Sequence, residues 1–247
     1  GGECVIGVGL SEYVGAREDA GIEFSNGKLS GRSLFLIDGK DADGFLLANK
    51  SGELYLVDAS SKGIEVTELT TVDKTRTSIE LILKDVDAEL LTGSSDKSVI
   101  EKVLDAGRLM LSADTVGAAQ VMLDKSVAYS LERKQFGRLI GSFQAVKHMC
   151  AEMAADLEPC HSMIWHAAHC LDNVPEEARL MACQTKAHIS EVGKQVSKTA
   201  TEVHGGMGFT DELGLHYWFK RIGLNRQLLG SPELIREEAG KLQGFDQ

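Results

Sequence analysis

Two short glycine-containing segments carry the residue types best suited to holding a dinucleotide: residues 132–137 (Glu-Arg-Lys-Gln-Phe-Gly) and residues 204–210 (His-Gly-Gly-Met-Gly-Phe-Thr). The paired glycines of the second segment let backbone N–H groups approach a pyrophosphate. In the first segment, Arg133 brings positive charge and Phe136 brings a ring on which an adenine can stack. Each segment alone also fits a simpler role, as a helix stop or a complement to the helix dipole. Together they suggest a dinucleotide held between helix ends. Because no strand precedes the glycines, the pattern is not that of a Rossmann fold.

A third group of chemistry-bearing residues lies on one predicted helix. Glu158 and His161 are three positions apart, and His166, His169 and Cys170 follow at i, i+3 and i+4. Both spacings place ligand types on one helix face, as in metal sites of helical bundles. A carboxylate-bridged di-iron centre needs a second Glu-x-x-His motif, which the sequence lacks. We therefore expect these side chains to be packed or solvated and predict no metal ion.

The composition argues against several function classes. The formal net charge of −11 disfavours a nucleic-acid partner, which needs clustered Lys and Arg. The five cysteines form no Cys-x-x-Cys pair, which indicates a reducing, intracellular setting. With no run of about 18 apolar residues and no leader pattern, we expect no membrane span and a cytoplasmic location, or the mitochondrial matrix in a eukaryote. Gly-x-Ser-x-Gly, P-loop and His-Glu-x-x-His motifs are also absent, so nucleophilic catalysis and phosphoryl transfer have no support.

The elements that must position these residues fall into two parts. Up to about residue 95 the apolar residues alternate or form short runs, which predicts strands. Asn26-Gly27 is the strongest hairpin signal, because both central residues of a type I′ turn need a positive φ. We predict an antiparallel β sandwich or barrel over residues 1–95.

From residue 96 onward the apolar period changes to about 3.6, which predicts helices. Three long helices are expected at about 96–132, 142–171 and 176–203, and two shorter ones at about 212–225 and 232–242. Long antiparallel helices with short connections pack as a bundle. The predicted fold class is therefore α+β, with an antiparallel four-helix-bundle-type domain over residues 96–247.

The order of these features resembles the acyl-CoA dehydrogenase family: a β domain, residues 132–137, Phe143-Gln144, a long helix pair and residues 204–210. The resemblance implies FAD as cofactor and an acyl-CoA thioester as substrate. In that family a carboxylate removes the α proton and the flavin accepts the β hydride. The family also has an amino-terminal helical domain, which ought to precede Gly1 and is not present in this chain.

In this family one subunit reaches across a dimer interface to its neighbour's FAD. The resemblance carries this role to seven positions: Arg133, Gln135, Phe136, Gln144, Glu202, Gly205 and Gly206. Glu202 departs from the Gln of many relatives, and a carboxylate near a pyrophosphate repels it unless a cation offsets the charge. We call this set of seven residues the lent site.

The family's catalytic glutamate is missing from both positions that can hold it. It usually comes directly before the glycine of the last loop, where this chain has Leu229. A minority of relatives place it before the arginine that aligns with Arg108, where this chain has Gly107. Neither Leu nor Gly can take a proton, so we predict no catalytic residue in this chain.

The segments expected to face the chain's own flavin are altered as well. Relatives carry Trp-Ile-Ser/Thr-Asn where this chain has Phe35-Leu36-Ile37-Asp38, which removes a hydroxyl that would bond the flavin. The Thr-Glu-Pro-x-x-Gly-Ser-Asp loop corresponds to residues 11–19, Ser-Glu-Tyr-Val-Gly-Ala-Arg-Glu-Asp.

All seven residues of the lent site are present, whereas the segments expected to face the chain's own flavin are altered and the catalytic glutamate is missing. This contrast predicts a subunit of a heteromeric dehydrogenase. The residues of its motifs resemble those of family members that form α2β2 assemblies with a catalytic partner subunit. Those members act on steroid side-chain CoA thioesters. Such an assembly would pass electrons to an acceptor such as an electron-transfer flavoprotein. Two alternatives stay open: an active homo-oligomer in which Asp105 or Asp114 serves as a relocated base, and a non-enzymatic or metal-binding helical scaffold built on the His166/His169/Cys170 face.

Overall fold

The computed structural model describes residues 2–15 and 20–245. The chain divides into two compact units, Gly1–Leu104 and Asp105–Gln247, which are described separately below. The first turns of the helix that begins at Lys97 thus group with the β unit. The domain assignment 1–95 and 96–247 stays a prediction. Among the described residues, no helix combines the length and apolar character needed to cross a membrane.

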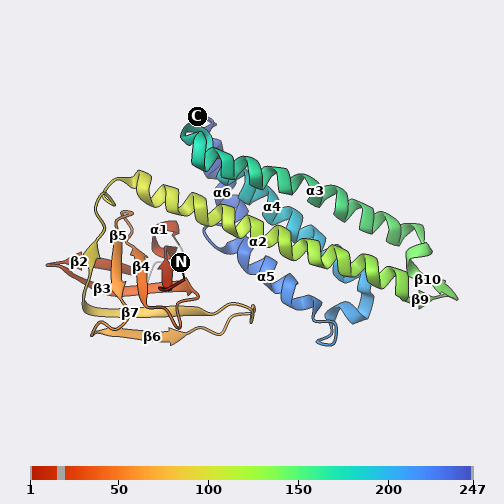
Figure 1. The fold of residues 1–247 in the computed structure, drawn as a ribbon, viewed down its shortest axis with the longest axis horizontal. Coiled ribbons are helices and arrows are strands. Elements are labelled where there is room, and N and C mark those ends of the chain that lie inside the picture. Colours follow the sequence, from red (N-terminus) through yellow and green to blue (C-terminus); the bar gives the residue numbers. More distant parts are fainter. Residues whose placement is uncertain (1, 16–19, 246–247) are drawn as a thin grey trace. The chain divides into compact units, whose positions relative to one another are not determined.

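The first unit is built on one eight-stranded sheet with the order β6-β7-β3-β1-β4-β5-β8, and β2 pairs with β3. Its elements are β1 (Ile6–Gly9), α1 (Ser11–Val14), β2 (Gly21–Ser25), β3 (Lys28–Ile37), β4 (Gly44–Ala48), β5 (Leu54–Asp58), β6 (Ile64–Glu68), β7 (Ser78–Asp87) and β8 (Glu89–Leu90). The pairing is antiparallel except between β1 and β4, which run parallel (Figure 1). A parallel pair needs a crossover connection, which here includes two other strands, and the period-two pattern carries no sign of it.

The predicted hairpin between β2 and β3 is confirmed. Asn26 and Gly27 have φ values of 52° and 77°, and Ser25 pairs with Lys28 directly beyond the turn. Leu29 and Leu36 of β3 are both fully enclosed although they lie seven residues apart, because irregularities in the pairing with β7 between them interrupt the alternation. Local turn chemistry therefore fixes the register of β2 against β3.

The second unit is helical. Its elements are α2 (Lys97–Glu132), whose start belongs to the first unit, β9 (Lys134–Gln135), β10 (Arg138–Leu139), η1 (Ile140–Ser142), α3 (Gln144–Asn173), α4 (Pro175–His204), η2 (Gly205–Phe209), α5 (Leu215–Gln227) and α6 (Pro232–Leu242). The five predicted helices are confirmed, with ends shifted by up to three residues. The largest shift is at α5, which starts at Leu215 because Gly214 takes a left-handed conformation (φ 61°) just before it.

Cap chemistry explains where the long helices begin and end. The Asp96 carboxylate accepts the Ser98 backbone N–H at 3.0 Å ahead of α2, which satisfies one of the free donors of a helix start. Pro175 occupies the first position of α4, where its missing N–H costs nothing. Gly205 follows the end of α4 with φ 59°, a conformation that glycine adopts without strain.

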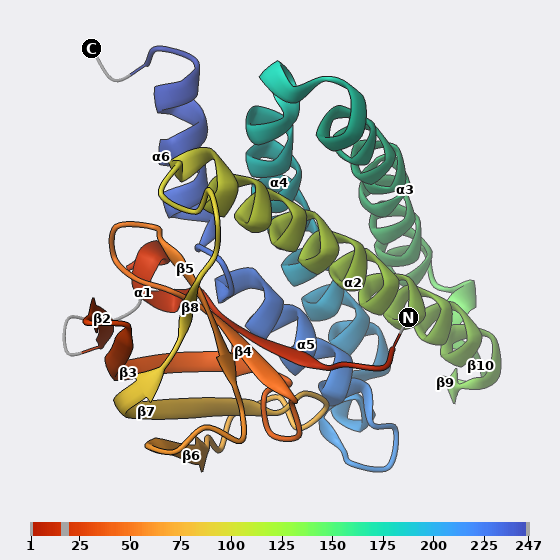
Figure 2. The same ribbon diagram turned by 60° about the vertical axis from the view of Figure 1, so that its left-hand side comes forward.

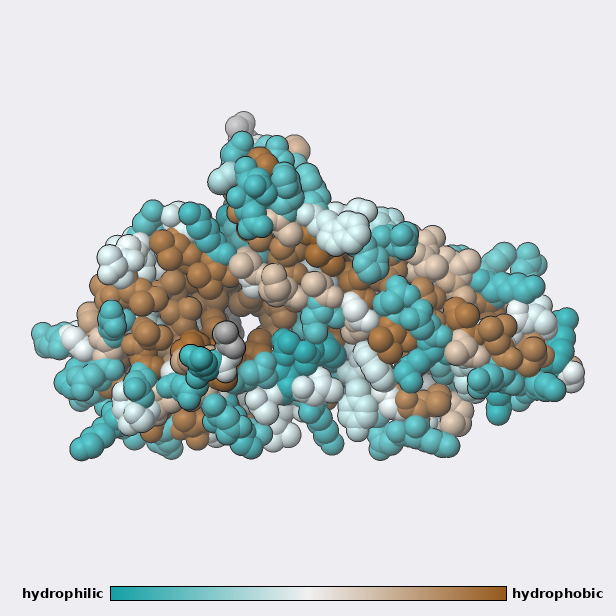
Figure 3. Space-filling view, in the orientation of Figure 1, coloured by the Kyte–Doolittle hydropathy of each residue, from teal (hydrophilic) through white to brown (hydrophobic). Residues whose placement is uncertain are grey.

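The core of the helical unit is shared by its three long helices. Figures 1 and 2 show α3 and α4 lying side by side along their length. Their facing apolar residues meet those of α2 in one cluster that includes Met122, Met153, Leu157, Val196 and Ala200. Outside this core the visible surface of the helical unit mixes hydrophobic with hydrophilic side chains (Figure 3).

Candidate functional site

The end of α2 presents residues 133–138 on a tight two-stranded turn. Ile140 donates its backbone N–H to the Arg133 carbonyl at 2.8 Å, and β9 pairs with β10 around the turn. Phe136 and Gly137 form the tip with φ values of 53° and 76°. All six residues of this stretch are exposed, so the side chains of Arg133 and Gln135 are open to a ligand.

Phe136 is 92% exposed, which is unusual for an aromatic side chain. Its ring meets that of Phe143 edge-on, with centroids 6.2 Å apart. Phe143 is covered on its face by the Arg138 guanidinium at 3.9 Å. Burying a phenyl ring contributes about 1.5 to 3 kcal/mol, so Phe136 is a ready stacking surface for a ligand or another chain.

Gln144 begins α3 directly after Phe143 and is also exposed. Its amide nitrogen lies 3.4 Å from the His148 Nε2 one turn along the helix. The exposed amides of Gln144 and Gln135 can each donate a hydrogen bond to a ligand and accept one from it.

The loop after α4 contains two kinds of glycine. At one position packing within this chain leaves no room for a side chain, and at another it does leave room. A Cβ at Gly208 would lie 2.8 Å from the Thr201 carbonyl oxygen, so packing explains that glycine. A Cβ at Gly206 would meet nothing within 4 Å, and Gly206 does not have a positive φ. Gly205 and Gly206 are exposed, as is Glu202 one turn earlier. Neither packing nor backbone conformation within the described residues therefore requires a glycine at position 206.

The two segments are joined by a ring stack. Tyr129, one turn before Arg133, stacks on His204, which directly precedes Gly205: the centroids are 4.7 Å apart and the planes are tilted by 28°. His204 is only 5% exposed, and its Nδ1–H donates to the Ala200 carbonyl at 2.7 Å. The fold thereby brings the end of α2 to the end of α4. The sequence analysis included His204 in the glycine segment without giving it a role, and it missed Tyr129, which lies one helical turn before Arg133.

Gly107 and Leu229, the two positions at which we expected a catalytic glutamate, lie against each other. A Cβ at Gly107 would lie 2.5 Å from Leu229 Cδ1, so the leucine side chain fills the space over the glycine. Leu229 itself has φ 57°, a strained conformation for a branched residue. Arg108 Nε donates to the Leu229 carbonyl at 3.1 Å and holds this loop in place.

Neither carboxylate considered as a relocated base is free. Asp105 is buried and pairs with Arg179 at 2.8 Å and with Arg108 at 3.8 Å. Asp114 pairs with Arg221 at 2.8 Å. A carboxylate beside an arginine is a weaker proton acceptor, because the guanidinium stabilises its charged form.

In the β unit, the strand expected to face a flavin is irregular. Phe35 interrupts the pairing of β3 with β7 as a bulge with φ 57°, and it is 41% exposed. Ile37, at the position where the resemblance leads us to expect a hydroxyl, ends the strand. Asp38 follows with φ 54° and lies 3.7 Å from the Arg76 guanidinium.

The loop predicted at residues 11–19 is described only up to Gly15; residues 16–19 lie outside the described residues. Within it, Glu12 is buried and accepts the Leu34 backbone N–H at 3.0 Å and the Ser33 hydroxyl at 3.3 Å. Burial raises the pKa of Glu12 above its ordinary value, against the opposing effect of these bonds. Glu12 therefore braces the bulged part of β3.

Comparisons with known proteins agree with this architecture. The family model for the acyl-CoA dehydrogenase C-terminal domain matches residues 97–242. Subunit CarC of the caffeyl-CoA reductase–Etf complex of Acetobacterium woodii is 39% identical over 111 residues, which are 45% of this chain and 29% of CarC. Acyl-CoA dehydrogenase IpdE2 of Mycolicibacterium smegmatis is 34% identical over 139 residues, covering 56% of this chain and 42% of IpdE2.

Among solved structures, the Tcur3481–Tcur3483 steroid ACAD superposes with a TM-score of 0.85 at 25% identity, covering 97% of this chain and 67% of that chain. The chain spans half or less of the length of the curated relatives that it matches. The family is one of FAD-dependent oxidoreductases. On the match of its helical unit and on its fold, this chain belongs to the acyl-CoA dehydrogenase family.

Proposed function

We propose that this chain is the non-catalytic half of a heteromeric acyl-CoA dehydrogenase, and that it completes an FAD site whose reactive ring lies in a partner subunit. The observation that carries this proposal is the contact between Leu229 and Gly107. Both positions for the base lack a carboxylate, and an apolar side chain fills the space between them. The lent site, in contrast, is exposed and open.

The lent site has the chemistry that the distal half of FAD requires. Phe136 offers its ring face to the adenine, and Arg133 offers a charge to the pyrophosphate. The Gly205 N–H already donates to the Glu202 carbonyl, whereas at Gly206 nothing in this chain stands where a side chain would be, so the pyrophosphate has room to approach the backbone there. Glu202 is exposed near the same loop, so its repulsion of the pyrophosphate is screened by water and offset by Arg133.

When bound, FAD supplies the acceptor for a hydride from the substrate. The other half of the reaction is removal of the α proton, which needs a base within hydrogen-bond reach of the α carbon. Leu229 and Gly107 cannot be that base, and Asp105 and Asp114 are held by arginines. The base is therefore assigned to the partner subunit.

Two relatives support a heteromeric assembly. CarC is named as a subunit of a complex with Etf, and the steroid ACAD structure carries the names of two proteins. By analogy we assign to this chain an α2β2 arrangement, a lipid or steroid side-chain CoA thioester as the substrate of the complex, and an acceptor of the electron-transfer flavoprotein type.

The decisive experiment compares this chain expressed alone with the chain co-expressed with a dehydrogenase-like partner that carries the missing glutamate. We expect flavin absorbance and acyl-CoA oxidation only in the co-purified complex. Phe136→Ala should lower the FAD content of the complex, whereas Trp165→Ala, at another highly exposed aromatic residue, should not. Stoichiometric FAD and turnover in the lone chain would overturn the proposal.

A further inference from the structure

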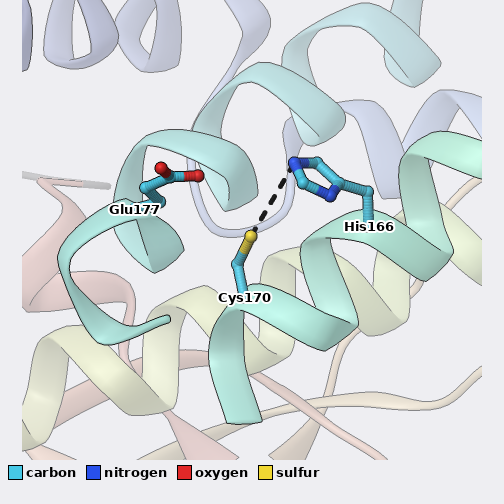
Figure 4. A group of neighbouring side chains, drawn as sticks. All are labelled: His166, Cys170 and Glu177. Atoms are coloured by element: carbon cyan, nitrogen blue, oxygen red, sulfur yellow. Dashed lines mark hydrogen bonds between the residues drawn. The ribbon is translucent and has the colours of Figure 1, made fainter. Parts of the chain in front are cut away.

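Three side chains of different ligand type converge where α3 passes into α4. His166 and Cys170 lie one turn apart near the end of α3, and Glu177 lies in the first turn of α4 (Figure 4). One donor atom from each lies within 4.8 Å of the other two. Cys170 Sγ and His166 Nε2 are 3.8 Å apart. The group thus takes one ligand from a second helix.

This arrangement differs from the one that the sequence pattern offered. His169, grouped there with His166 and Cys170, turns to Asn173, whose amide nitrogen lies 3.2 Å from His169 Nδ1. Glu177 is the third member of the group instead of His169, because the short connection between α3 and α4 brings the start of α4 beside the end of α3. The spacing of residues along one helix cannot show a contact that depends on such a turn.

The backbone fixes the three residues before any ion binds. Val174 donates its N–H to the Cys170 carbonyl at 3.0 Å and closes α3, and Pro175 starts α4 at once. Cys170 is 0% exposed, so packing holds its thiol in place. His166 and Glu177 are exposed, so an ion in solution has access to the group from their side.

We propose that His166, Cys170 and Glu177 bind a divalent transition-metal ion of the Zn²⁺ class, with water as the fourth ligand. A sulfur, an imidazole nitrogen and a carboxylate oxygen suit Zn²⁺ or Co²⁺, whereas Mg²⁺ and Ca²⁺ prefer oxygen ligands alone. At ordinary bond lengths a sulfur and a nitrogen on one tetrahedral ion lie about 3.6 Å apart, close to the 3.8 Å found here.

Binding forms a metal–sulfur bond and breaks the S–H bond of Cys170, and the proton passes to solvent. His166 supplies a lone pair of its ring nitrogen and Glu177 a carboxylate oxygen. The ion joins the end of α3 to the start of α4. Because it binds only the folded arrangement, it should raise the melting temperature of the chain.

The test is a Co²⁺ titration of the chelator-treated full chain, followed by the absorption band of a thiolate–Co²⁺ bond. Loss of a group that only orients a ligand costs about tenfold in metal affinity. His166→Gln and Glu177→Gln should therefore weaken binding at least that much, and Cys170→Ser should remove the band. His169→Gln, on the same helix, is the matched control and should bind Co²⁺ as the unmodified chain does.

Absence of the thiolate band at saturating Co²⁺ in the unmodified chain would overturn the proposal. Persistence of the thiolate band in Cys170→Ser would also overturn it. So would an equal loss of Co²⁺ affinity in His169→Gln and His166→Gln. Should Cys170→Ser fail to fold because the position is buried, the exposed Glu177→Gln variant still decides the question. Neither FAD nor a partner subunit enters the measurement, so its outcome is independent of the proposed function.

Discussion

Leu229 covers Gly107: a Cβ at position 107 would come within 2.5 Å of Leu229 Cδ1. These are the two positions at which we expected, from the resemblance, the family's catalytic glutamate. Their contact places both positions at the same point of the helical unit. In this chain a leucine methyl group fills that space.

A double-mutant cycle tests this contact. Gly117→Ala, on the same helix with open space around it, should stabilise the chain by about 1 kcal/mol through helix propensity. Gly107→Ala should stabilise the chain less than this, because the Leu229 side chain must move. In a Leu229→Ala background, Gly107→Ala should give the full increase in the free energy of unfolding, as measured with urea. Equal effects of Gly107→Ala in both backgrounds would show that the two residues do not interact.

Gly206 tests the lent site with little risk to folding. Because a Cβ there meets nothing in this chain, Gly206→Ala should leave the melting temperature of the lone chain unchanged or slightly raised. In the complex the added methyl group should keep the pyrophosphate from close approach to the backbone. The hydrogen bond to a charged group that is lost in this way should weaken FAD binding about tenfold or more. The control is Gly223→Ala, an exposed glycine of α5 with equally open surroundings. Equal FAD affinity of the two variants would contradict the assignment.

The stack of Tyr129 on His204 should position the glycine loop against Arg133. His204→Ala removes a stacked ring pair, whose geometry contributes about 0.5 to 1.5 kcal/mol beyond burial. We expect a lower melting temperature and weaker FAD retention by the complex. Tyr129→Phe keeps the ring and should preserve both properties. A His204→Ala variant that loses stability yet keeps its FAD affinity would show that the stack is structural only.

Lys186 should make stability depend on pH. It is 1% exposed and donates to the Asn225 carbonyl at 2.6 Å and the Ser190 hydroxyl at 3.1 Å. Burial, aided by Arg108 and Arg226, lowers its pKa from 10.5 to about 7. Between these values the unfolded chain binds more protons, so the free energy of unfolding should rise with pH, by at most about 1.4 kcal/mol per pH unit.

Urea unfolding at a series of pH values checks this expectation against Lys186→Met. The variant has no titrating group at this position. Between pH 7 and 10.5 its free energy of unfolding should therefore rise less steeply with pH than that of the unmodified chain. Below pH 7 the cost of burying the charge is fully present in the unmodified chain. An identical slope in both proteins would place the pH dependence elsewhere.

Local signals in the sequence determined the elements and much of their boundaries. Asn26-Gly27 fixes a hairpin, Pro175 a helix start and Gly205 a helix end, because turn and cap chemistry acts within a few residues. The role of the lent site and the missing glutamate stay predictions from the sequence. The family and its fold followed from the order of these signals, and the comparisons confirmed them.

Tertiary structure alone decided which distant residues meet. The parallel pairing of β1 with β4, the stack of Tyr129 on His204 and the contact of Leu229 with Gly107 join segments far apart in the chain. Glu177 joins His166 and Cys170 only through the turn between two helices. Such contacts depend on how whole elements pack against each other. The hydrophobic periodicity of the sequence indicates which face of an element is buried, but it does not indicate which neighbouring element covers that face.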